Sequence, residues 1–149
     1  MTAKKLNFTY MKKNVPVSTI MTSNVIKLNL TDDLTKAESL FKKHHIRHIP
    51  VVSGNHIVGM LSYTDLLRIS FADAVDDDEL EVDVTVYNMF SVEQVMARNL
   101  VKVSPDTTIK EVAEILSKRE FHALPVVLDE LLVGIVTTTD LIKYLIDQY

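Results

Sequence analysis

The chain has 149 residues, of which 47% are hydrophobic and 24% charged, and it contains no cysteine. This composition is ordinary for a folded globular protein, and the lack of cysteine excludes disulfide scaffolds, thiol nucleophiles and thiolate metal sites. The formal net charge of −4 argues against a nucleic-acid partner, because nucleic-acid-binding surfaces carry a basic excess. A single nucleotide is not excluded, since it needs only a few local donors.

Residues 1–16 form an expected N-terminal extension. They contain lysines but no apolar core of the length of a signal peptide, and no stretch of the chain reaches the ~18 apolar residues of a membrane span. We therefore expect a soluble, cytoplasmic protein that makes no membrane contact.

One pattern occurs twice, in residues 17–68 and 92–143, at a constant offset of 75 residues, so that Met21 recurs as Met96 and Asp65 as Asp140. Solenoid proteins use periods of roughly 20–50 residues and need about three or more copies. A tandem pair of this length instead predicts two units related by a pseudo-twofold axis. Any site at their contact should then come in duplicate.

In chain order, each copy begins with a segment that fits one helical turn, 17–21 or 92–96, followed by an expected strand over 24–28 or 99–103. Small polar and acidic residues then precede an amphipathic helix, as is typical of helix N-termini. This helix begins at Leu34 in the first copy and at Ile109 in the second.

Two short apolar runs follow in each copy and predict strands, 49–52 with 56–61 and 124–127 with 131–136. A final apolar helix comes after them. The order helix, strand, helix, strand, strand, helix predicts an α+β fold in which the two repeats pack through their sheets.

The segment between the copies, residues 69–91, is strongly acidic. We expect a solvated linker with a short strand at Val82–Val86 rather than a cation site, because no EF-hand spacing is present. Its acidic residues are Asp73, Asp76, Asp77, Asp78, Glu79, Glu81 and Asp83. Residues 144–149 form a C-terminal tail.

Three features together resemble the cystathionine β-synthase (CBS) domain family: the Met-Thr-Ser-Asn-Val-Ile opening of the first copy, the X-Pro-Val-Val strand of both copies, and the stretch from Val58 to Leu66 with its partner from Val133 to Leu141. The resemblance implies a tandem CBS pair that binds an adenosine-containing ligand. It also implies a homodimer formed through the helices.

The motif closest to chemistry is Ser62-x-x-Asp65, repeated as Thr137-x-x-Asp140. The residues alone leave two interpretations open. A hydroxyl followed three residues later by an acid is also a capping box at a helix start. The resemblance favours a ligand site, in which the carboxylate accepts hydrogen bonds from ribose hydroxyls and the hydroxyl and helix N–H groups suit phosphate.

Carried over by position, the resemblance implies two clefts built across the repeats. One cleft joins Ser62 and Asp65 to Asn99, Val101, His122, Ala123 and Pro125. The other joins Thr137 and Asp140 to Thr22, Asn24, Ile26, Arg47, His48 and Pro50.

In these clefts, Ile26 and Val101 would lie against adenine, although both are also ordinary core residues by pattern. Arg47, His48 and His122 would contact phosphate. Because His48 aligns with Ala123, the Asp140 cleft has more positive partners, and we expect it to bind more tightly.

The expected function is therefore a regulatory sensor of AMP, ADP or ATP, with S-adenosylmethionine or NAD as further possibilities, no required metal, and a target enzyme or transporter as partner. One alternative is a ligand-independent interaction or oligomerisation module. A remote alternative is a small nucleotide-hydrolysing enzyme, but no recognisable arrangement of nucleophile, base and oxyanion donors is present, so we expect no enzyme activity.

The nearest thing to a metal cluster is His44, His45 and His48. These residues straddle an expected helix end, so the i, i+4 spacing does not guarantee a common face. The aligned residues of the second copy are Arg119, Glu120 and Ala123, and we therefore expect no zinc site.

Overall fold

The computed structural model describes residues 14–72 and 87–149 of the chain. The expected strand at Val82–Val86, the acidic residues of the linker and most of the N-terminal extension lie outside the described residues.

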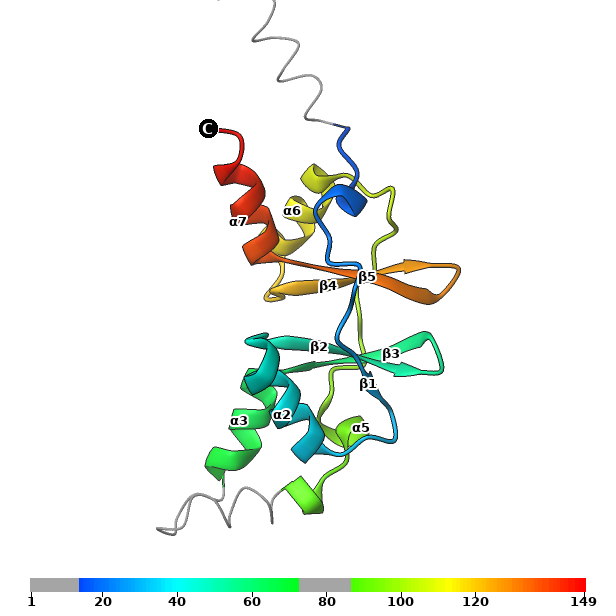
Figure 1. Cartoon of the computed structure of the whole chain (residues 1–149), viewed down its shortest axis with the longest axis vertical. Coiled ribbons are helices and arrows are strands. Elements are labelled where there is room, and N and C mark those ends of the chain that lie inside the picture. Colours follow the sequence, from blue (N-terminus) through cyan, green and yellow to red (C-terminus); the bar gives the residue numbers. More distant parts are fainter. Residues whose placement is uncertain (1–13, 73–86) are drawn as a thin grey trace, which may run out of the picture. The chain divides into compact units, whose positions relative to one another are not determined.

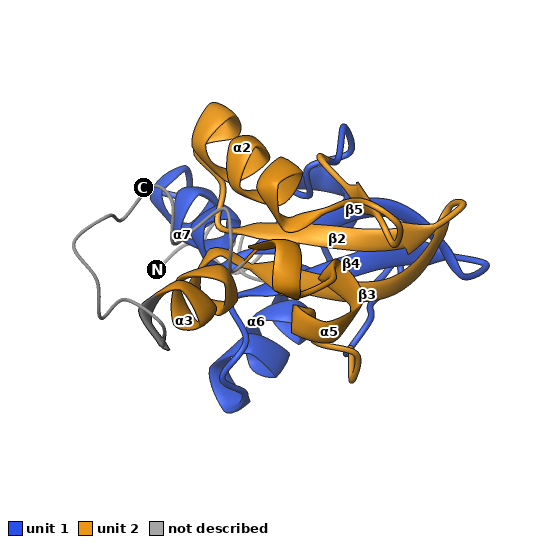
Figure 2. Cartoon of the chain, turned by 90° about the horizontal axis from the view of Figure 1, so that it is seen from below, with its two compact units in different colours: residues 1–25, 101–149 blue, residues 26–100 orange. Residues whose placement is uncertain are grey.

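The chain divides into two compact units that do not coincide with its two sequence repeats (Figure 2). Unit 1 comprises Met1–Val25 and Val101–Tyr149, and unit 2 comprises Ile26–Leu100. The opening turn of the first copy thus belongs to the unit that contains the hairpin and helices of the second copy. The opening turn of the second copy belongs in the same way to the unit of the first copy. Each unit is completed by a segment of the other repeat.

Unit 2 is a three-stranded sheet with helices, in which β1 pairs parallel to β2 and β2 pairs antiparallel to β3 (Figure 1). Its elements are β1 (Leu28–Asn29), α2 (Leu34–His44), β2 (His48–Ser53), β3 (His56–Ser62), α3 (Tyr63–Ala72) and α5 (Val92–Val95).

Unit 1 repeats this plan around an antiparallel β4–β5 pair. Its elements are η1 (Val17–Thr19), α6 (Ile109–Lys118), β4 (Ala123–Leu128), β5 (Leu131–Thr137) and α7 (Thr138–Ile146). The α+β class is therefore confirmed, and so is the predicted order of elements apart from the first strand of the second copy.

The first strand of each copy is much shorter than predicted. In place of 24–28 the structure has the two-residue β1, and in place of 99–103 it has one isolated parallel bridge, Val103 with Val126. Asn24 and Asn99 are exposed, whereas Leu28 and Val103 are buried. Only the last residues of each predicted strand therefore gain a buried position and a partner strand.

Helix caps explain why the two amphipathic helices begin where they do. The Asp33 carboxylate accepts the N–H of Lys36 at the start of α2, at 2.8 Å. Thr108 and Glu111 form a reciprocal capping box at the start of α6. Each pair provides partners for N–H groups that a helix N-terminus leaves without intrahelical acceptors.

The apolar face of each helix packs into the core of its own unit. The unit 2 core contains Leu34, Ala37 and Phe41 of α2 with Ile49, Val51 and Leu61 of the sheet, and also Val92 and Met96 from the opening of the second copy. The unit 1 core contains Val112 and Leu116 of α6 with Leu124, Val126 and Val136, and also Val17 from the opening of the first copy.

Two glycines of the repeat allow these exchanged segments to approach. A Cβ atom on Gly59 would lie 2.2 Å from Sδ of Met96, and one on Gly134 would lie 2.5 Å from Sδ of Met21. Beside each contact the two backbones exchange a pair of hydrogen bonds. In unit 2 these join Met60 and Ala97, at 3.0 and 2.9 Å, and in unit 1 they join Thr22 and Ile135, at 2.9 and 3.0 Å. Glycine is therefore required by the packing of methionine on a strand.

The two hairpins reverse the chain in different ways. Gly54 has a φ of 64° in the β2–β3 turn, whereas Asp129 and Glu130 have φ values of 51° and 67° in the β4–β5 turn. Positive φ at both central residues is the pattern of a type I′ turn, which usually contains Asn or Gly. The second turn thus adopts this conformation without glycine.

We expect Gly59→Ala and Gly134→Ala each to lower the free energy of unfolding by about 1–3 kcal/mol, because the added methyl group overpacks a buried contact. Urea unfolding measures the effect, with Ser39→Ala on the exposed side of α2 as a control that should stay within about 0.5 kcal/mol of the parent. In the double variant Gly59→Ala/Met96→Ala the losses should be less than additive. Strict additivity would contradict the proposed clash.

Asp32 provides a second test, of acid stability. Its Oδ2 accepts the N–H of Asn29 at 2.8 Å and pairs with Lys36 Nζ at 3.0 Å. Burial raises the pKa of Asp32, but these hydrogen bonds and the Lys36 charge outweigh it and leave the pKa below its ordinary value of 3.8. The equivalent Thr107 accepts the N–H of Ser104 at 3.0 Å through its hydroxyl.

Because the pKa of Asp32 is lowered by folding, its contribution to stability is present above pH 3.8 and is lost as the pH falls through the folded value. We expect Asp32→Thr, which copies the second repeat, to keep the turn and to reduce the loss of stability on acidification below about pH 4. Thermal unfolding between pH 2 and pH 7 gives the two profiles. Parallel profiles would show that Asp32 does not contribute.

Candidate ligand-binding site

In unit 2 the Ser62-x-x-Asp65 motif spans the junction between β3 and α3. The N–H of Ser62 donates to Asp65 Oδ2 at 3.2 Å, and the N–H of Asp65 donates to Ser62 Oγ at 3.0 Å. The two residues thus form a reciprocal capping box. The Asp65 side chain keeps 23% of its surface exposed, so it remains accessible to a ligand.

In unit 1 the Thr137-x-x-Asp140 motif has the same arrangement at the start of α7. Asp140 Oδ2 accepts from the N–H of Thr137 at 2.8 Å and from its hydroxyl at 3.1 Å. The N–H of Asp140 in turn donates to Thr137 Oγ1 at 3.2 Å. The capping interpretation that the sequence left open is therefore realised in both copies.

Capping uses only one oxygen of each carboxylate, so it leaves the ligand interpretation open. A carboxylate has two oxygens and about four lone-pair positions. Asp65 Oδ1 lies 3.6 Å from Nη1 of Arg68, one turn further along α3. Among the described residues, the equivalent Lys143 makes no ion pair with Asp140. Sequence reasoning missed Arg68, although its spacing of three residues from Asp65 on a helix was a usable signal.

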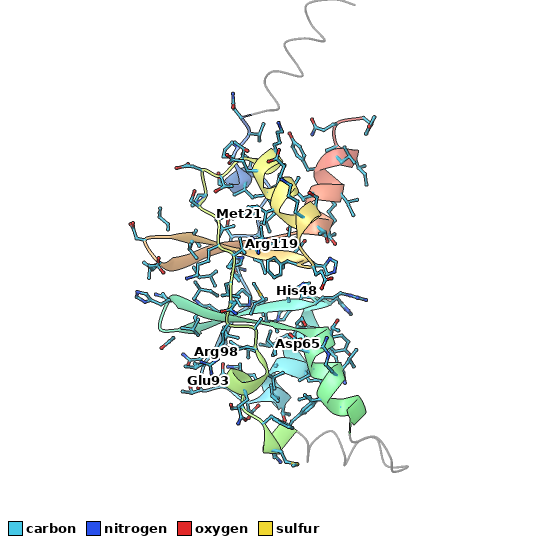
Figure 3. The ribbon with its side chains drawn as sticks, turned by 180° about the vertical axis from the view of Figure 1, so that it is seen from behind. Met21, His48, Asp65, Glu93, Arg98 and Arg119 are labelled. Carbon is cyan, nitrogen blue, oxygen red and sulfur yellow. The ribbon has the colours of Figure 1, made fainter. Side chains whose placement is uncertain are left out.

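The strand-start residues lie beside the motif of their own copy. His48 is the Cα partner of Ser62, and the N–H of Tyr63 donates to the carbonyl of Arg47 at 2.8 Å. Figure 3 shows His48 and Asp65 at the same end of unit 2. Arg47 is exposed and His48 half-buried. Basic side chains therefore flank the Asp65 motif within one unit.

Unit 1 has the equivalent backbone with different side chains. Ala123 is the Cα partner of Thr137, and the N–H of Thr138 donates to the carbonyl of His122 at 3.0 Å. His122 is exposed and Ala123 buried. Arg47 and His48 thus belong to the same unit as Asp65, and their assignment to the Asp140 cleft stays a prediction.

The other predicted site residues are divided between the units. Thr22 pairs with Ile135 in unit 1, where Asn24 is exposed, Val101 half-buried and Pro125 buried in β4. In unit 2 Ile26 is half-buried, Pro50 is buried in β2 and Asn99 is exposed. Each implied cleft draws residues from both units, and both clefts remain predictions.

His44 and His45 lie at the end of a helix. His44 is the last residue of α2, and His45 is its C-cap with a left-handed φ of 52°. Within residues 14–72 and 87–149, no group of three or more His, Cys, Asp or Glu side chains is arranged to hold a metal ion.

None of the helices in the described part of the chain is long and apolar enough to cross a membrane.

Comparisons with known proteins agree with this architecture. A curated protein of Methanocaldococcus jannaschii is 32% identical over 139 residues, which is 91% of this chain and 33% of the relative. A second protein from that organism is 26% identical, and the chain covers 48% of it. The chain thus spans about a third to a half of these relatives.

Solved structures match over nearly the whole chain. The CBS domain of a CBS domain-containing membrane protein from Sphaerobacter thermophilus has 28% identity and a TM-score of 0.79, with coverage of 95% of this chain and 94% of that one. The CBS domain pair of protein MJ0100, solved with 5′-methylthioadenosine and S-adenosyl-L-methionine, has 25% identity and a TM-score of 0.75, with coverage of 91% and 98%.

The family model of the CBS domain matches residues 17–72 and again residues 92–147, which are the two copies of the repeat. With this match over most of its length, the chain belongs to the CBS domain family and contains two CBS domains in tandem.

Proposed function

We propose that the chain is a regulatory module that binds an adenosine-containing ligand through its two Ser/Thr-x-x-Asp motifs. The observation that carries the proposal is the duplicated, half-buried aspartate, which the capping box holds by one oxygen at the start of a helix. The CBS pair of protein MJ0100, with 5′-methylthioadenosine and S-adenosyl-L-methionine bound, supports this ligand class.

The proposed chemistry divides the work between the two carboxylate oxygens. Oδ2 is held by the backbone of Ser62 or Thr137, which fixes the carboxylate before a ligand arrives. Oδ1 accepts hydrogen bonds from the vicinal hydroxyls of ribose. Because the carboxylate is already oriented, less conformational entropy is lost on binding.

The two hydroxyls of the motifs have different tasks in this proposal. Ser62 Oγ accepts the N–H of Asp65 and keeps its proton for a ligand, whereas Thr137 Oγ1 donates its proton to Asp140 Oδ2. The hydroxyl of Thr137 therefore serves to orient Asp140.

Under this proposal, the basic side chains beside each motif attract the phosphate groups of anionic ligands. The phosphates of AMP, ADP or ATP are attracted to Arg47 and His48 beside the Asp65 motif, while His122 is the corresponding partner beside Asp140. Ile26 and Val101 supply apolar contacts to adenine. Within unit 2 the Asp65 motif is thus favourable for an anionic ligand, and the tighter binding that the resemblance implies for the Asp140 cleft stays a prediction that calorimetry tests. No step requires a metal ion.

We expect 5′-methylthioadenosine, S-adenosylmethionine, NAD, AMP, ADP or ATP to raise the thermal stability of the chain. A ligand that binds only the folded state adds about 2.7 kcal/mol at a free concentration of 100 Kd. A thermal-shift series identifies the ligand, and calorimetry then counts the sites. Asp65→Asn and Asp140→Asn, which keep an oxygen for the cap, should each remove one binding event.

Thr139→Ala, at an exposed position inside the second motif, is the matched control and should bind as the parent does. Absence of a shift with every ligand at millimolar concentration would overturn the proposal. Because the capping boxes are complete without a ligand, that outcome would favour the alternative of a ligand-independent interaction module.

The proposed assembly is a cytoplasmic homodimer that acts on a target enzyme or transporter and catalyses no reaction itself. In support, α7 contains no buried residue, and its side chains Ile142, Leu145 and Ile146 are 57%, 56% and 64% exposed. A stripe of large apolar side chains on one helix is costly in water, and a second copy would cover it.

We expect Leu145→Glu/Ile146→Glu to convert a dimer into a monomer, because two charges would be buried at the proposed contact without partners. Light scattering on the parent and the variant measures the change. Leu128→Glu, at an exposed apolar position in β4, is the control and should remain dimeric. A parent that is monomeric at high concentration would exclude the dimer.

A further inference from the structure

We propose that Arg68 determines the ligand specificity of the Asp65 motif, by occupying the carboxylate oxygen that a ribose would use. The inference rests on the proposed function, because it concerns the same two aspartates. It concerns a difference between the two otherwise equivalent motifs.

At the Asp65 motif both carboxylate oxygens already have partners. Oδ2 accepts the N–H of Ser62 at 3.2 Å, and Oδ1 lies 3.6 Å from Nη1 of Arg68. Arg68 lies three residues after Asp65 on α3, so the two side chains are neighbours on one face of the helix. A ribose diol at Oδ1 therefore competes with the guanidinium for the same carboxylate oxygen.

At the Asp140 motif the equivalent oxygen has no hydrogen bond or ion pair to any residue that the structure describes. Oδ2 accepts both hydrogen bonds from Thr137, at 2.8 and 3.1 Å. Lys143 occupies the position of Arg68 but forms no ion pair with Asp140 within the described residues. Asp140 Oδ1 therefore accepts a ribose hydroxyl without displacing a side chain.

The Asp65–Arg68 pair is weak enough for a ligand to displace. The Arg68 side chain is 75% exposed, and an exposed ion pair contributes little and is screened by salt. The displaced guanidinium stays near the bound ligand. The guanidinium attracts the phosphate group of a nucleotide, but an uncharged nucleoside has no group to which it is attracted in this way.

The Asp65 motif consequently discriminates against uncharged nucleosides and in favour of phosphorylated ones, while the Asp140 motif does not discriminate in this way. Arg47 and His48, which lie at the same end of unit 2, act in the same direction on phosphate. Arg68 differs from them in that its Nη1 lies 3.6 Å from the Oδ1 of Asp65, the oxygen proposed for the ribose.

The test uses adenosine, which is uncharged, and AMP as probes, with one motif isolated at a time. In an Asp140→Asn background, Arg68→Gln should tighten adenosine binding about threefold, the range of an exposed ion pair, and should not tighten AMP binding. Isothermal titration calorimetry gives both dissociation constants. In an Asp65→Asn background, the matched variant Lys143→Gln should leave adenosine binding unchanged.

Salt provides an independent readout. Raising the ionic strength should strengthen adenosine binding in the Asp140→Asn protein, because the Asp65–Arg68 pair is screened, and should have no such effect once Arg68 is replaced. Adenosine binding that Arg68→Gln leaves unchanged or weakens would overturn this inference alone. Absence of adenosine and AMP binding in both backgrounds and in the parent would also overturn this inference, and the proposed function falls with it only if no ligand of the thermal-shift series binds.

Discussion

The contact of a methionine side chain with a glycine in a strand is the constraint on which the rest of the structure depends. Sδ of Met96 lies 2.2 Å from the position that a Cβ on Gly59 would take, and Sδ of Met21 lies 2.5 Å from that of Gly134. This contact anchors the opening segment of each repeat to the hairpin of the other. The chain can complete neither core with one repeat alone, since Val17 and Val92 are fully buried in cores made mainly by the opposite copy. Two repeats are therefore the smallest number that folds in this way.

The same exchange leaves the motif turns free for the proposed ligand. The opening segments add backbone hydrogen bonds at Met60 and Ile135, in the interior of β3 and β5. The Ser62 and Thr137 ends of these strands lead instead into helices, where a capping box orients an aspartate. Stability and the proposed ligand binding thus involve different parts of one hairpin. Because the cap and the ligand use different carboxylate oxygens, the aspartate can serve both.

Much of this could be predicted from the sequence, because it depends on local periodicity and on the comparison of two copies. The order of elements followed from that pattern, and the helix caps at Asp33 and Thr108 from small polar residues before an apolar face. The exchange of opening segments could not be predicted, because a glycine in a strand does not show which side chain fills the space. The first strands were overestimated, since Asn24 and Asn99 belong to apolar runs without gaining a partner strand.

The candidate site likewise has parts that the sequence predicts and parts that it does not. The comparison of the copies found Asp65 and Asp140, yet it did not show that Arg47 and His48 belong to the unit of Asp65, because pairing of His48 with Ser62 is a property of strand register. It also overlooked Arg68, whose difference from Lys143 has no meaning until the orientation of the carboxylate is known. Repetition fixes the backbone of both motifs and the position of each aspartate. The selectivity of each motif must then come from the neighbouring side chains that differ between the copies, because only these can distinguish two ligands at otherwise equal sites.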